Sequence, residues 1–474
     1  MRTTSLLAIV CAVCVQAGAL ELGAPFADGM VLQRGRAVPV WGWAKPGEEV
    51  KVSFAGVSRS ARADSAGAWQ VTLPKLETSA TGRVLRVNDV EISDVLVGEV
   101  WFVAGQSNAE FPIWSRKHRS RDHNGALTAA MTDRPDIRFC LYSNYASRDK
   151  PLRRGARRAL WKPMNYRTLC RDVKDVSFSA MGVYFAKEIQ AATGVPVGIV
   201  EAAWGSTRIE AWTPPSGFAL AHAVSSFVPD PKKPQQRPSF IWNEQVAPWA
   251  PMAMRGLLWY QGCSNVREHG EYAQLMHALY RGWANEFSNP GLRLYFVQLA
   301  PWGDPRVPHI QEQQARFARE EPNADMVVAN DIGCLTDIHP HDKATVGKRL
   351  AAMALARDYG WDFDPEAPVL RSWKVEGCRY VLDFDHARAF NIYNEDPSSS
   401  YTGFELAGSD GVWKPGRIDN LPSNPNQDIP EPRLVVSAAG VDRPVKLRYL
   451  HSSPWRGVIR NELSLPLPTF HIGD

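Results

Sequence analysis

The sequence predicts a mixed α/β protein with a doubly wound parallel sheet, flanked along the chain by an N-terminal and a C-terminal β-region. Two observations carry this prediction. From about residue 95 to 362, apolar runs of strand length alternate with helical stretches, as in domains built on a parallel sheet. On both sides of this stretch, short runs of alternating apolar and polar residues are separated by Gly, Pro and Asp turns, which is typical of antiparallel sheets.

The first 19 residues have the pattern of a secretory signal peptide. Arg2 precedes an apolar run over 6–15, and Ala17-Gly18-Ala19 forms a small-residue exit. This run is too short for a membrane span, and no later stretch is long and apolar enough, so we expect no span. The chain contains no Asn-x-Ser/Thr site, which favours an exported bacterial protein, secreted or periplasmic, over a glycosylated one.

Residues 20–94 are expected to form the N-terminal β-domain, with strands at 38–43 and 50–54. Trp41, Trp43 and Trp69 lie on strand-like runs of which one face must be buried. Packing of this domain against the next one is therefore favoured over a role as a carbohydrate-binding module.

Residues 95–362 are expected to form the α/β domain, and residues 363–474 a C-terminal β-region. Periodicity predicts further elements in both, namely helices at 179–192, 272–286, 310–320 and 343–357, and strands at 294–299, 326–330, 380–384 and 445–449. The segment 214–238 is rich in proline and lysine and has no periodicity, so a long loop near the site is predicted there.

Composition places the chain among ordinary globular proteins. It has 474 residues, 45% of them apolar and 22% charged, with a net charge of +4. That charge is too small to indicate a nucleic-acid partner. Positive charge does gather in the first third, in a cluster over 116–121 and in a second cluster comprising Lys150, Arg153, Arg154, Arg157 and Arg158. Solvated loops are the favoured interpretation, and attraction of an anionic glycan is the alternative.

Five of the seven cysteines lie outside the predicted signal peptide, so at least one is unpaired. Cys140 and Cys170 are candidates for a disulfide in an oxidising compartment. The five cysteines outside the predicted signal peptide form no Cys-x-x-Cys pair and the histidines form no His-x-x-x-His pair, so the sequence predicts neither a metal site nor a cofactor. Cys263 is interpreted as a small buried apolar residue rather than a second nucleophile.

Chemistry is indicated first at Ser107. An apolar run over 100–104 ends in Gly105-Gln106-Ser107-Asn108, which can place a hydroxyl at a strand end. Backbone N–H groups opening a helix there would face developing negative charge. A helix N-cap serine is the competing interpretation.

Three later segments favour the chemical interpretation. Residues 198–207 form a strand-like run ending at Gly205, residues 256–265 form another ending near Asn265, and Asp337-Ile338-His339-Pro340 precedes the helical stretch 343–357. Open α/β sheets gather their active sites at strand ends. A serine, a backbone glycine, an asparagine and a histidine could therefore meet at one edge of the sheet.

These four blocks resemble those of the SGNH hydrolases. Within that group, fuller strings resemble the sialate O-acetylesterase family, namely Met30-Val31-Leu32-Gln33-Arg34, Gly105-Gln106-Ser107-Asn108, Ile209-Glu210-Ala211-Trp212, Trp259-Tyr260-Gln261-Gly262-x-Ser264-Asn265 and Asp337-Ile338-His339-Pro340-x-x-Lys343. The resemblance implies an SGNH-type α/β fold and a carbohydrate esterase. Two departures stand out, since relatives typically carry glutamate where this chain has Cys263, and the SGNH aspartate lies three residues before the histidine, whereas Asp337 lies two before His339.

The resemblance also implies roles for these residues. Ser107 would be the nucleophile, His339 the base and Asp337 the acid that orients it, with a dyad as the alternative if Asp337 does not reach the imidazole. The oxyanion would be held by the N–H of Ser107, the N–H of Gly205 and the amide of Asn265. Gln106, Asn108 and Gln261 are candidates for sugar contacts, with turn stabilisation as the alternative.

The expected activity is hydrolysis of O-acetyl esters, with sialic acids as the first candidate substrate. Arg208 is the candidate for gripping a sialic acid carboxylate, and a salt bridge to Glu210 is the alternative. Acetyl groups of plant polysaccharides such as acetylated xylan are the second candidate substrate. A glycan-binding protein without catalysis is disfavoured, because Ser107 and His339 are both present.

Overall fold

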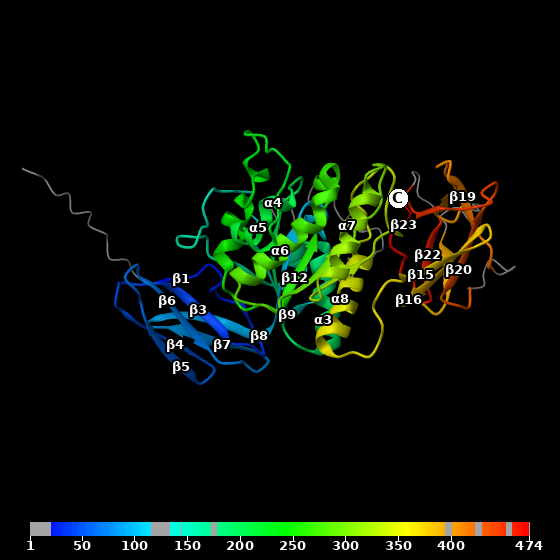
Figure 1. Cartoon of the computed structure of the whole chain (residues 1–474). Coiled ribbons are helices and arrows are strands. Elements are labelled where there is room, and N and C mark those ends of the chain that lie inside the picture. The colour runs from blue at the N-terminus through cyan, green and yellow to red at the C-terminus, as the bar shows by residue number, and fades with distance from the viewer. Residues whose placement is uncertain are drawn as a thin grey trace, which may run out of the picture.

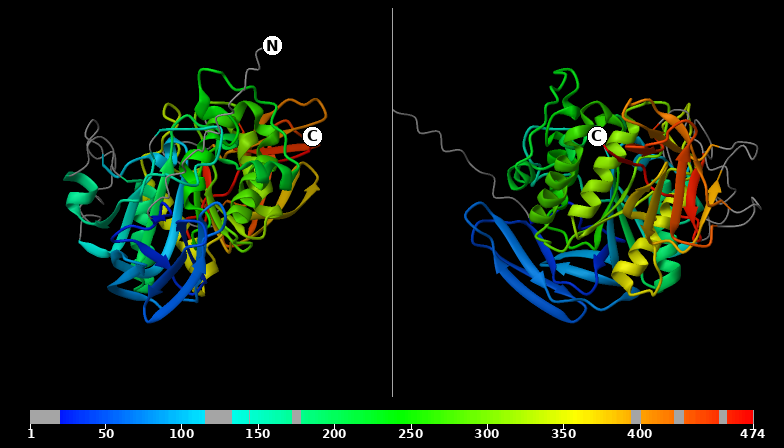
Figure 2. Two further views of the ribbon diagram at one scale, coloured as in Figure 1. Left: turned by 90° about the vertical axis from the view of Figure 1, so that its left-hand side faces the viewer. Right: turned by 45° about the vertical axis from the view of Figure 1, so that its right-hand side comes forward.

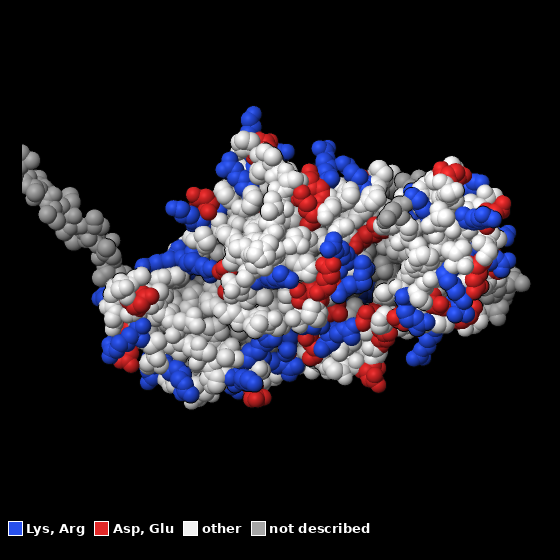
Figure 3. Space-filling model, viewed as in Figure 1, with Lys and Arg blue, Asp and Glu red and all other residues white. Residues whose placement is uncertain are grey.

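The computed structural model describes residues 20–114, 133–143, 145–171, 178–393, 401–421, 429–451 and 457–473. The predicted signal peptide and the basic cluster over 116–121 lie outside these residues. In Figure 1 the N-terminal strands lie at one end of the molecule, the helices and the parallel sheet in the middle, and the C-terminal strands at the other end. Lys and Arg are interspersed with Asp and Glu over the face drawn in Figure 3.

The two N-terminal strands that alternation predicts, at 38–43 and 50–54, are present. A three-stranded antiparallel sheet has the order β1 (Glu21–Leu22), β3 (Val38–Trp43) and β6 (Ala68–Leu73). Four more strands belong to a second, larger sheet, namely β2 (Val31–Gln33), β4 (Glu49–Phe54), β5 (Val57–Arg62) and β7 (Ser79–Val87). Trp41 and Trp69 are buried in the hydrophobic cluster that also fills the α/β part, which agrees with the predicted packing role.

The 16-residue strand β8 (Val90–Gly105) connects the N-terminal strands with the centre of the molecule. Its first half pairs with β7 in antiparallel fashion, and its second half pairs in parallel with two later strands. The strand therefore runs without a break across residue 94, where the composition of the sequence changes.

The central parallel strands have the order β9 (Arg134–Leu141), β11 (Val197–Ala203), β8, β12 (Gly256–Tyr260), β13 (Arg293–Val297) and β14 (Ala324–Val327), with β10 (Trp161–Met164) antiparallel at the edge. The first of these strands in the chain, β8, lies between β11 and β12. The strand order therefore reverses beside β8, and the carboxyl end of β8 lies at the switch point where open α/β sheets bind their ligands.

Helices cover both faces of this sheet. Trp101 on β8 contacts Phe185 of α3 (Ala180–Thr193), with 4.9 Å between ring centroids, whereas the next residue, Phe102, contacts Trp283 of α6 (Tyr272–Glu286) at 5.2 Å. Successive strand residues point to opposite faces, so α3 and α6 lie on opposite sides. Helix α8 (Lys343–Tyr359) packs beside α3, and α7 (Val307–Glu320) packs beside α6.

The segment 214–238 differs from the predicted long loop. It contains helix α5 (Pro215–Ala221) and the 3-10 turn η2 (Pro234–Gln236). Pro215 at the first helical position favours helix initiation, and seven residues are too few to show periodicity in the sequence. Helix α5 packs on α6 so closely that a Cβ at Gly217 would lie 2.2 Å from the carbonyl oxygen of Ala278. Short turns follow as η3 (Trp242–Val246) and η4 (Ala247–Trp249).

The C-terminal part is an antiparallel β-structure with its own hydrophobic cluster. Its seven-stranded sheet has the order β15 (Val369–Glu376), β16 (Arg379–Asp385), β20 (Arg433–Ala438), β19 (Lys414–Ile418), β18 (Phe404–Ala407), β21 (Lys446–Tyr449) and β23 (Phe470–Ile472). A separate pair consists of β17 (Phe390–Tyr393) and β22 (Val458–Asn461). The right-hand view of Figure 2 shows these strands beside the helices of the α/β part.

Polar contacts hold the C-terminal β-structure against the α/β part. Asn330 donates to the carbonyl of Leu467 at 3.0 Å, and Thr469 donates to Gln311 of α7 at 2.8 Å. Within the described part of the chain, no helix has both the length and the apolar character that crossing a membrane requires.

Candidate active site

Three predicted strand ends meet at one edge of the sheet. Gly105 at the end of β8 lies opposite Ala203 of β11 and Tyr260 of β12 in the parallel register. Gly105 has a φ of 136°, and a Cβ there would lie 2.3 Å from the carbonyl oxygen of Tyr260. Only glycine fits this close approach, and it allows the chain to turn directly into the short helix α1 (Ser107–Glu110).

Ser107 contacts the predicted histidine. Its Oγ lies 2.9 Å from Nε2 of His339, in the segment that leads into α8. Gln106, not Ser107, occupies the N-cap position of α1, and it makes no side-chain capping bond. The N-cap interpretation of Ser107 is therefore wrong, and its hydroxyl faces an imidazole instead.

Asp337 reaches the other nitrogen of the same ring. Its Oδ1 lies 3.0 Å from Nδ1 of His339 and accepts the backbone N–H of His339 at 2.8 Å. Burial alone would raise the pKa of Asp337, but the backbone hydrogen bond and the charge of His339 hold it below its usual value. An ionised Asp337 favours the tautomer with a proton on Nδ1, in which Nε2 is the acceptor in its contact with the Ser107 hydroxyl. His341 also faces Asp337, with Nε2 at 3.5 Å from Oδ2.

The predicted oxyanion glycine has a carboxylate partner. The N–H of Gly205 donates to Oε2 of Glu110 at 2.7 Å, and Tyr145 donates to the other oxygen of Glu110. Burial raises the pKa of Glu110, although these two hydrogen bonds oppose the shift. Gly205 does lie next to the serine, because a Cβ at Gly205 would be 3.4 Å from Cβ of Ser107. The Gly205 N–H thus lies beside Ser107 but is bound by a side chain.

Asn265 lies in η5 (Cys263–Glu271) and is fully buried. Its Nδ2 donates to Glu210 of α4 (Ile209–Trp212) at 2.9 Å, and its Oδ1 accepts the N–H of Ile209 at 3.2 Å. Gln261 donates to the same Oδ1 at 2.8 Å. This network joins the loops after β11 and β12, so one donor of the Asn265 amide is already bound to a carboxylate.

The three amides that are candidates for sugar contacts bond to neighbouring loops. Gln106, Asn108 and Gln261 are all buried. Gln106 accepts the N–H groups of Gly262 and Ser264, and Asn108 donates to the carbonyl of Ile338 at 2.9 Å. Because their polar atoms bond to neighbouring loops, the structure favours turn stabilisation over sugar contacts.

Arg208 is likewise bound within the protein. Its side chain is 4% exposed and pairs with Glu210, which is 0% exposed, at 3.0 Å and with Glu268 at 2.8 Å. It also donates to the carbonyl of Ser264, and its guanidinium lies 3.7 Å from the ring centre of Phe227. The local salt bridge that competed with carboxylate binding is therefore formed.

Lys343 is a buried residue of the site that sequence reasoning did not single out. Its Nζ donates to Oδ1 of Asn108 at 2.7 Å and to the carbonyl of Pro340 at 2.6 Å. Burial lowers the pKa of Lys343 to about 7. Burial also raises the pKa of the nearby Cys263 thiol to about 12, although the charge of Lys343 and a hydrogen bond with Asn108 oppose the shift. The only signal in the sequence was the place of Lys343 in the motif after His339.

The remaining sequence predictions concern cysteines and arginines. Cys140 is a buried free thiol and therefore does not form the candidate disulfide, whereas the side chain of Cys170 lies outside the described residues. Arginines of the second basic cluster bind neighbouring elements: Arg153 pairs with Glu286 at 2.6 Å, and Arg154 pairs with Glu21 at 3.0 Å. These two side chains therefore join parts of the protein.

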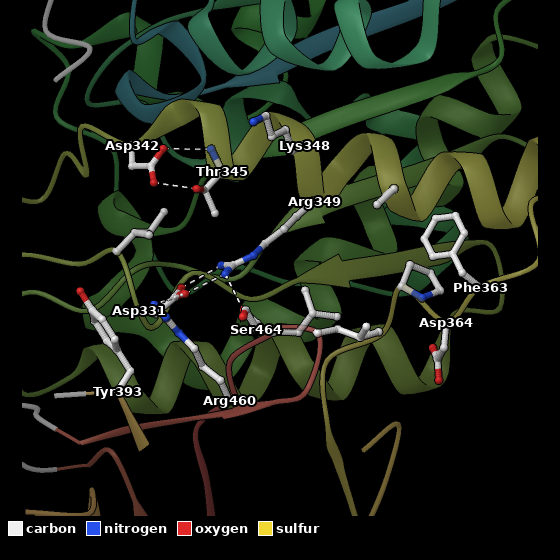
Figure 4. A pocket seen from close by; sticks show the side chains of 15 residues that line it. Asp331, Asp342, Thr345, Lys348, Arg349, Phe363, Asp364, Tyr393, Arg460 and Ser464 are labelled. Carbon is white, nitrogen blue, oxygen red and sulfur yellow. Dashed lines mark hydrogen bonds and ion pairs between the residues drawn. The ribbon is translucent and has the colours of Figure 1, made fainter. Parts of the chain in front are cut away.

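Two cavities flank the segment that carries the histidine. One, of about 470 Å³, is bounded by Trp302, Arg306 and Ile338, and Ile338 directly precedes His339. The other, of about 600 Å³, runs along α8 toward the C-terminal strands. Figure 4 shows Arg349 of α8 and Arg460 of β22 on its wall, both bonded to Asp331.

The chain is similar to known carbohydrate esterases. Human sialate O-acetylesterase is 27% identical over 415 residues, which cover 78% of this chain and 77% of the human protein. The rat sialate O-acetylesterase is 26% identical over 398 residues, covering 70% of this chain and 72% of the rat protein. The crystal structure of a carbohydrate acetylesterase from Xanthomonas citri superimposes with a TM-score of 0.82 at 29% identity, covering 96% of this chain and 99% of that one.

The fold and these similarities define a carbohydrate esterase, a hydrolase of carboxylic esters. Residues 97–356, more than half of the chain, match the family described as carbohydrate esterase, sialic acid-specific acetylesterase. The chain belongs to this family.

Proposed function

We propose that this enzyme is an SGNH-type hydrolase that removes O-acetyl groups from sialic acids, with Ser107 as nucleophile, His339 as base and Asp337 as the residue that orients His339. The contacts from Ser107 Oγ to Nε2 and from Nδ1 to Asp337 carry the proposal. The family match supports an acetylated sialic acid or related carbohydrate as substrate.

In the first step, Ser107 attacks the acetyl carbonyl while Nε2 of His339 takes the hydroxyl proton. The imidazolium that forms is stabilised by ionised Asp337 at Nδ1. His339 then gives the proton to the departing sugar hydroxyl, and an acetyl-serine remains. Water, activated by the same nitrogen, releases acetate and restores Ser107.

The tetrahedral oxyanion needs donors beside Ser107. The N–H of Ser107 is one, since the first N–H groups of a helix have no partner within it. The N–H of Gly205 is the second donor once the acetyl oxygen replaces the carboxylate of Glu110, which carries the same charge as the oxyanion. The Asn265 amide retains a second N–H beyond the one bound to Glu210 and is the third.

The cavity at Trp302 and Ile338 is the proposed place for the sugar, because it adjoins the loop of the catalytic base. Trp302 is partly exposed there and offers an apolar face. We further propose that residues 1–19 direct export of the enzyme and are removed from the mature form.

Acetylated plant polysaccharides such as acetylated xylan are the second candidate, supported by the similarity to a carbohydrate acetylesterase over nearly the whole chain. Acetate release from O-acetylated sialic acid and from acetylated xylan, measured on one purified sample, distinguishes the two. A kcat/KM at least tenfold higher for the sialic acid ester is the expected result. The reverse order would assign the enzyme to polysaccharide deacetylation, and no release from either would contradict the esterase mechanism.

A further inference from the structure

Histidines and a glutamate gather where α7 meets the C-terminal β-structure. His309 and Glu312 lie one turn apart on α7, and His451 and His471 come from the end of β21 and from β23. Nε2 of His451 lies 2.8 Å from Oε1 of Glu312, and Nδ1 of His471 lies 2.6 Å from the same oxygen. Two imidazoles therefore point at one carboxylate oxygen.

These three side chains converge from distant parts of the chain. In sequence, His451 is 139 residues and His471 159 residues from Glu312. Their three possible ligand atoms lie within 4.8 Å of one another, and the side chains are 17%, 7% and 50% exposed for Glu312, His451 and His471. The cluster is thus mostly shielded yet open to solvent on the side of His471.

Two imidazole nitrogens and one carboxylate oxygen are a ligand set that suits zinc. Zn²⁺ binds such atoms at about 2.0–2.2 Å in tetrahedral geometry, which places ligand atoms about 3.3 Å apart. The observed separations of 2.6 and 2.8 Å need to widen by only about 0.5–0.7 Å. The ion would take the place of the two protons that now bridge the histidines and Glu312.

We propose that Glu312, His451 and His471 form a binding site for Zn²⁺ or a similar nitrogen-preferring transition metal, which fixes the C-terminal β-structure to α7. This reverses the sequence-based prediction of no metal site, which rested on short histidine spacings. His309 lies close by, with its ring centroid 5.5 Å from that of His451. It is positioned to supply a fourth ligand by a side-chain rotation, and water is the alternative.

A second cluster in the structure provides a matched control. Asp364, Glu366 and His386 also have ligand atoms within 4.8 Å of one another. There, however, Arg357 forms an ion pair with Glu366, so a cation already balances the carboxylate. This cluster also holds one histidine instead of two, which makes it a poorer site for zinc.

The test is calorimetric titration of ZnCl₂ into full-length enzyme that carries no polyhistidine tag and has been stripped of metal with a chelator. Wild type is expected to bind one zinc ion at this site. His471→Ala and Glu312→Gln are expected to weaken that binding by at least about tenfold, as loss of a ligand requires. His471 is half exposed, so its replacement leaves the fold intact, which circular dichroism checks.

Two variants separate this site from other places where zinc could bind. His386→Ala removes the control cluster, and His339→Ala removes the histidine of the catalytic centre. Both are expected to keep the zinc affinity of wild type at the proposed site. In addition, zinc is expected to raise the melting temperature of wild type but not of His471→Ala, because the ion joins two parts of the fold. Equal zinc affinity in wild type, His471→Ala and Glu312→Gln, or no binding by wild type, would overturn the proposal.

Discussion

Nε2 of His339 lies 2.9 Å from Oγ of Ser107, although 232 residues separate them in the chain. The contact exists because β8 ends at the switch point of the sheet, and because Asn108 holds the loop of His339 by a 2.9 Å bond to the carbonyl of Ile338. Ser107 and His339 are therefore placed by the same turn, and a change in either is expected to affect chemistry more than folding.

Replacing Ser107 with alanine is predicted to abolish acetate release. The change removes the attacking oxygen and one hydrogen bond to His339, but no apolar contact of the core. Acetate release should fall to the level of the buffer, while the melting temperature stays within about 2 °C of wild type, as for a substitution without a packing defect. Near-normal turnover in this variant would contradict the assignment of the nucleophile.

Replacing Asp337 with asparagine is predicted to lower kcat by about 10⁴-fold, by analogy with other triads in which the aspartate is lost. The amide can donate to Nδ1 of His339, which would place the proton on the nitrogen that has to act as the base. Steady-state kinetics with a small acetyl ester measure this effect.

His341→Ala is the matched control for Asp337. His341 faces the same carboxylate at 3.5 Å, through Oδ2 and not through the Oδ1 that His339 contacts. It should retain kcat within about tenfold of wild type. If Asp337→Asn lowers kcat by less than about tenfold, the result would instead indicate a Ser107–His339 dyad.

Features that are local in sequence were predictable. The apolar run ending at Gly105 and the helical periodicity of 272–286 appear as β8 and α6. The geometry of Asp337 could not be derived, because a backbone hydrogen bond from His339 brings this carboxylate to Nδ1 despite the two-residue spacing.

Features that depend on distant partners were not predictable. Gly205 was expected to have a free N–H, but Glu110, 95 residues away, accepts it. The convergence of Glu312 with His451 and His471 likewise comes from the packing of α7 on the C-terminal strands. Neither contact leaves a periodic or local signal in the sequence.

The buried Nζ of Lys343 donates hydrogen bonds to Asn108 and Pro340. Neither acceptor is a carboxylate, and the nearby position 263 carries a cysteine instead of an acid. Burial lowers the pKa of Lys343 to about 7, whereas its pKa in the unfolded chain is 10.5. The free energy of unfolding is therefore highest above pH 10.5 and decreases as pH falls toward 7. Cys263→Asp supplies a carboxylate of similar volume and is predicted to reduce this loss.

The measurement is the melting temperature at pH 7 and at pH 9.5. Cys263→Asn has the same shape as the aspartate variant without its charge, so it should behave like wild type. At pH 7 the aspartate variant is expected to be more stable than the asparagine variant by about 1–3 kcal/mol, less than the full cost of an unpaired buried charge. Equal melting temperatures of the two variants at pH 7 would contradict an ion pair between Lys343 and the introduced carboxylate.

Glu201 on β11 predicts a second pH dependence, with the opposite sign. Burial raises the pKa of Glu201 to about 8, and the hydrogen bond from the N–H of Ser179 only partly opposes this. A raised folded pKa means that stability is full below the unfolded value of 4.5 and is lost as pH rises toward 8. The free energy of unfolding decreases by about 5 kcal/mol at most over this pH range.

Glu201→Gln keeps an oxygen for the N–H of Ser179 but cannot ionise. It is therefore predicted to melt above wild type at pH 8.5 and close to wild type at pH 5. Thermal unfolding at the two pH values tests this, with the acidic sample as internal control. If the melting temperatures of Glu201→Gln and wild type differ by the same amount at pH 5 and at pH 8.5, ionisation of Glu201 does not cause the difference.

Arg208 has two candidate roles, namely recognition of a substrate carboxylate and stabilisation of the loop after β11. Removing it leaves Glu210 buried with its charge uncompensated, and breaking a buried pair in this way costs about 3–5 kcal/mol. Arg208→Ala is therefore predicted to lower the melting temperature markedly and to reduce kcat/KM alike for O-acetylated sialic acid and for a neutral acetyl ester.

Arg208→Lys provides the control, because it keeps the positive charge but loses the two-point contact with Glu210 through Nε and Nη2. Its melting temperature should lie between those of wild type and Arg208→Ala, with activity on both esters following stability. Parallel losses mean that Arg208 acts through Glu210 and the loop that also carries Gly205. A loss confined to the sialic acid ester, with an unchanged melting temperature, would instead require its guanidinium to leave Glu210 and bind the carboxylate of the substrate.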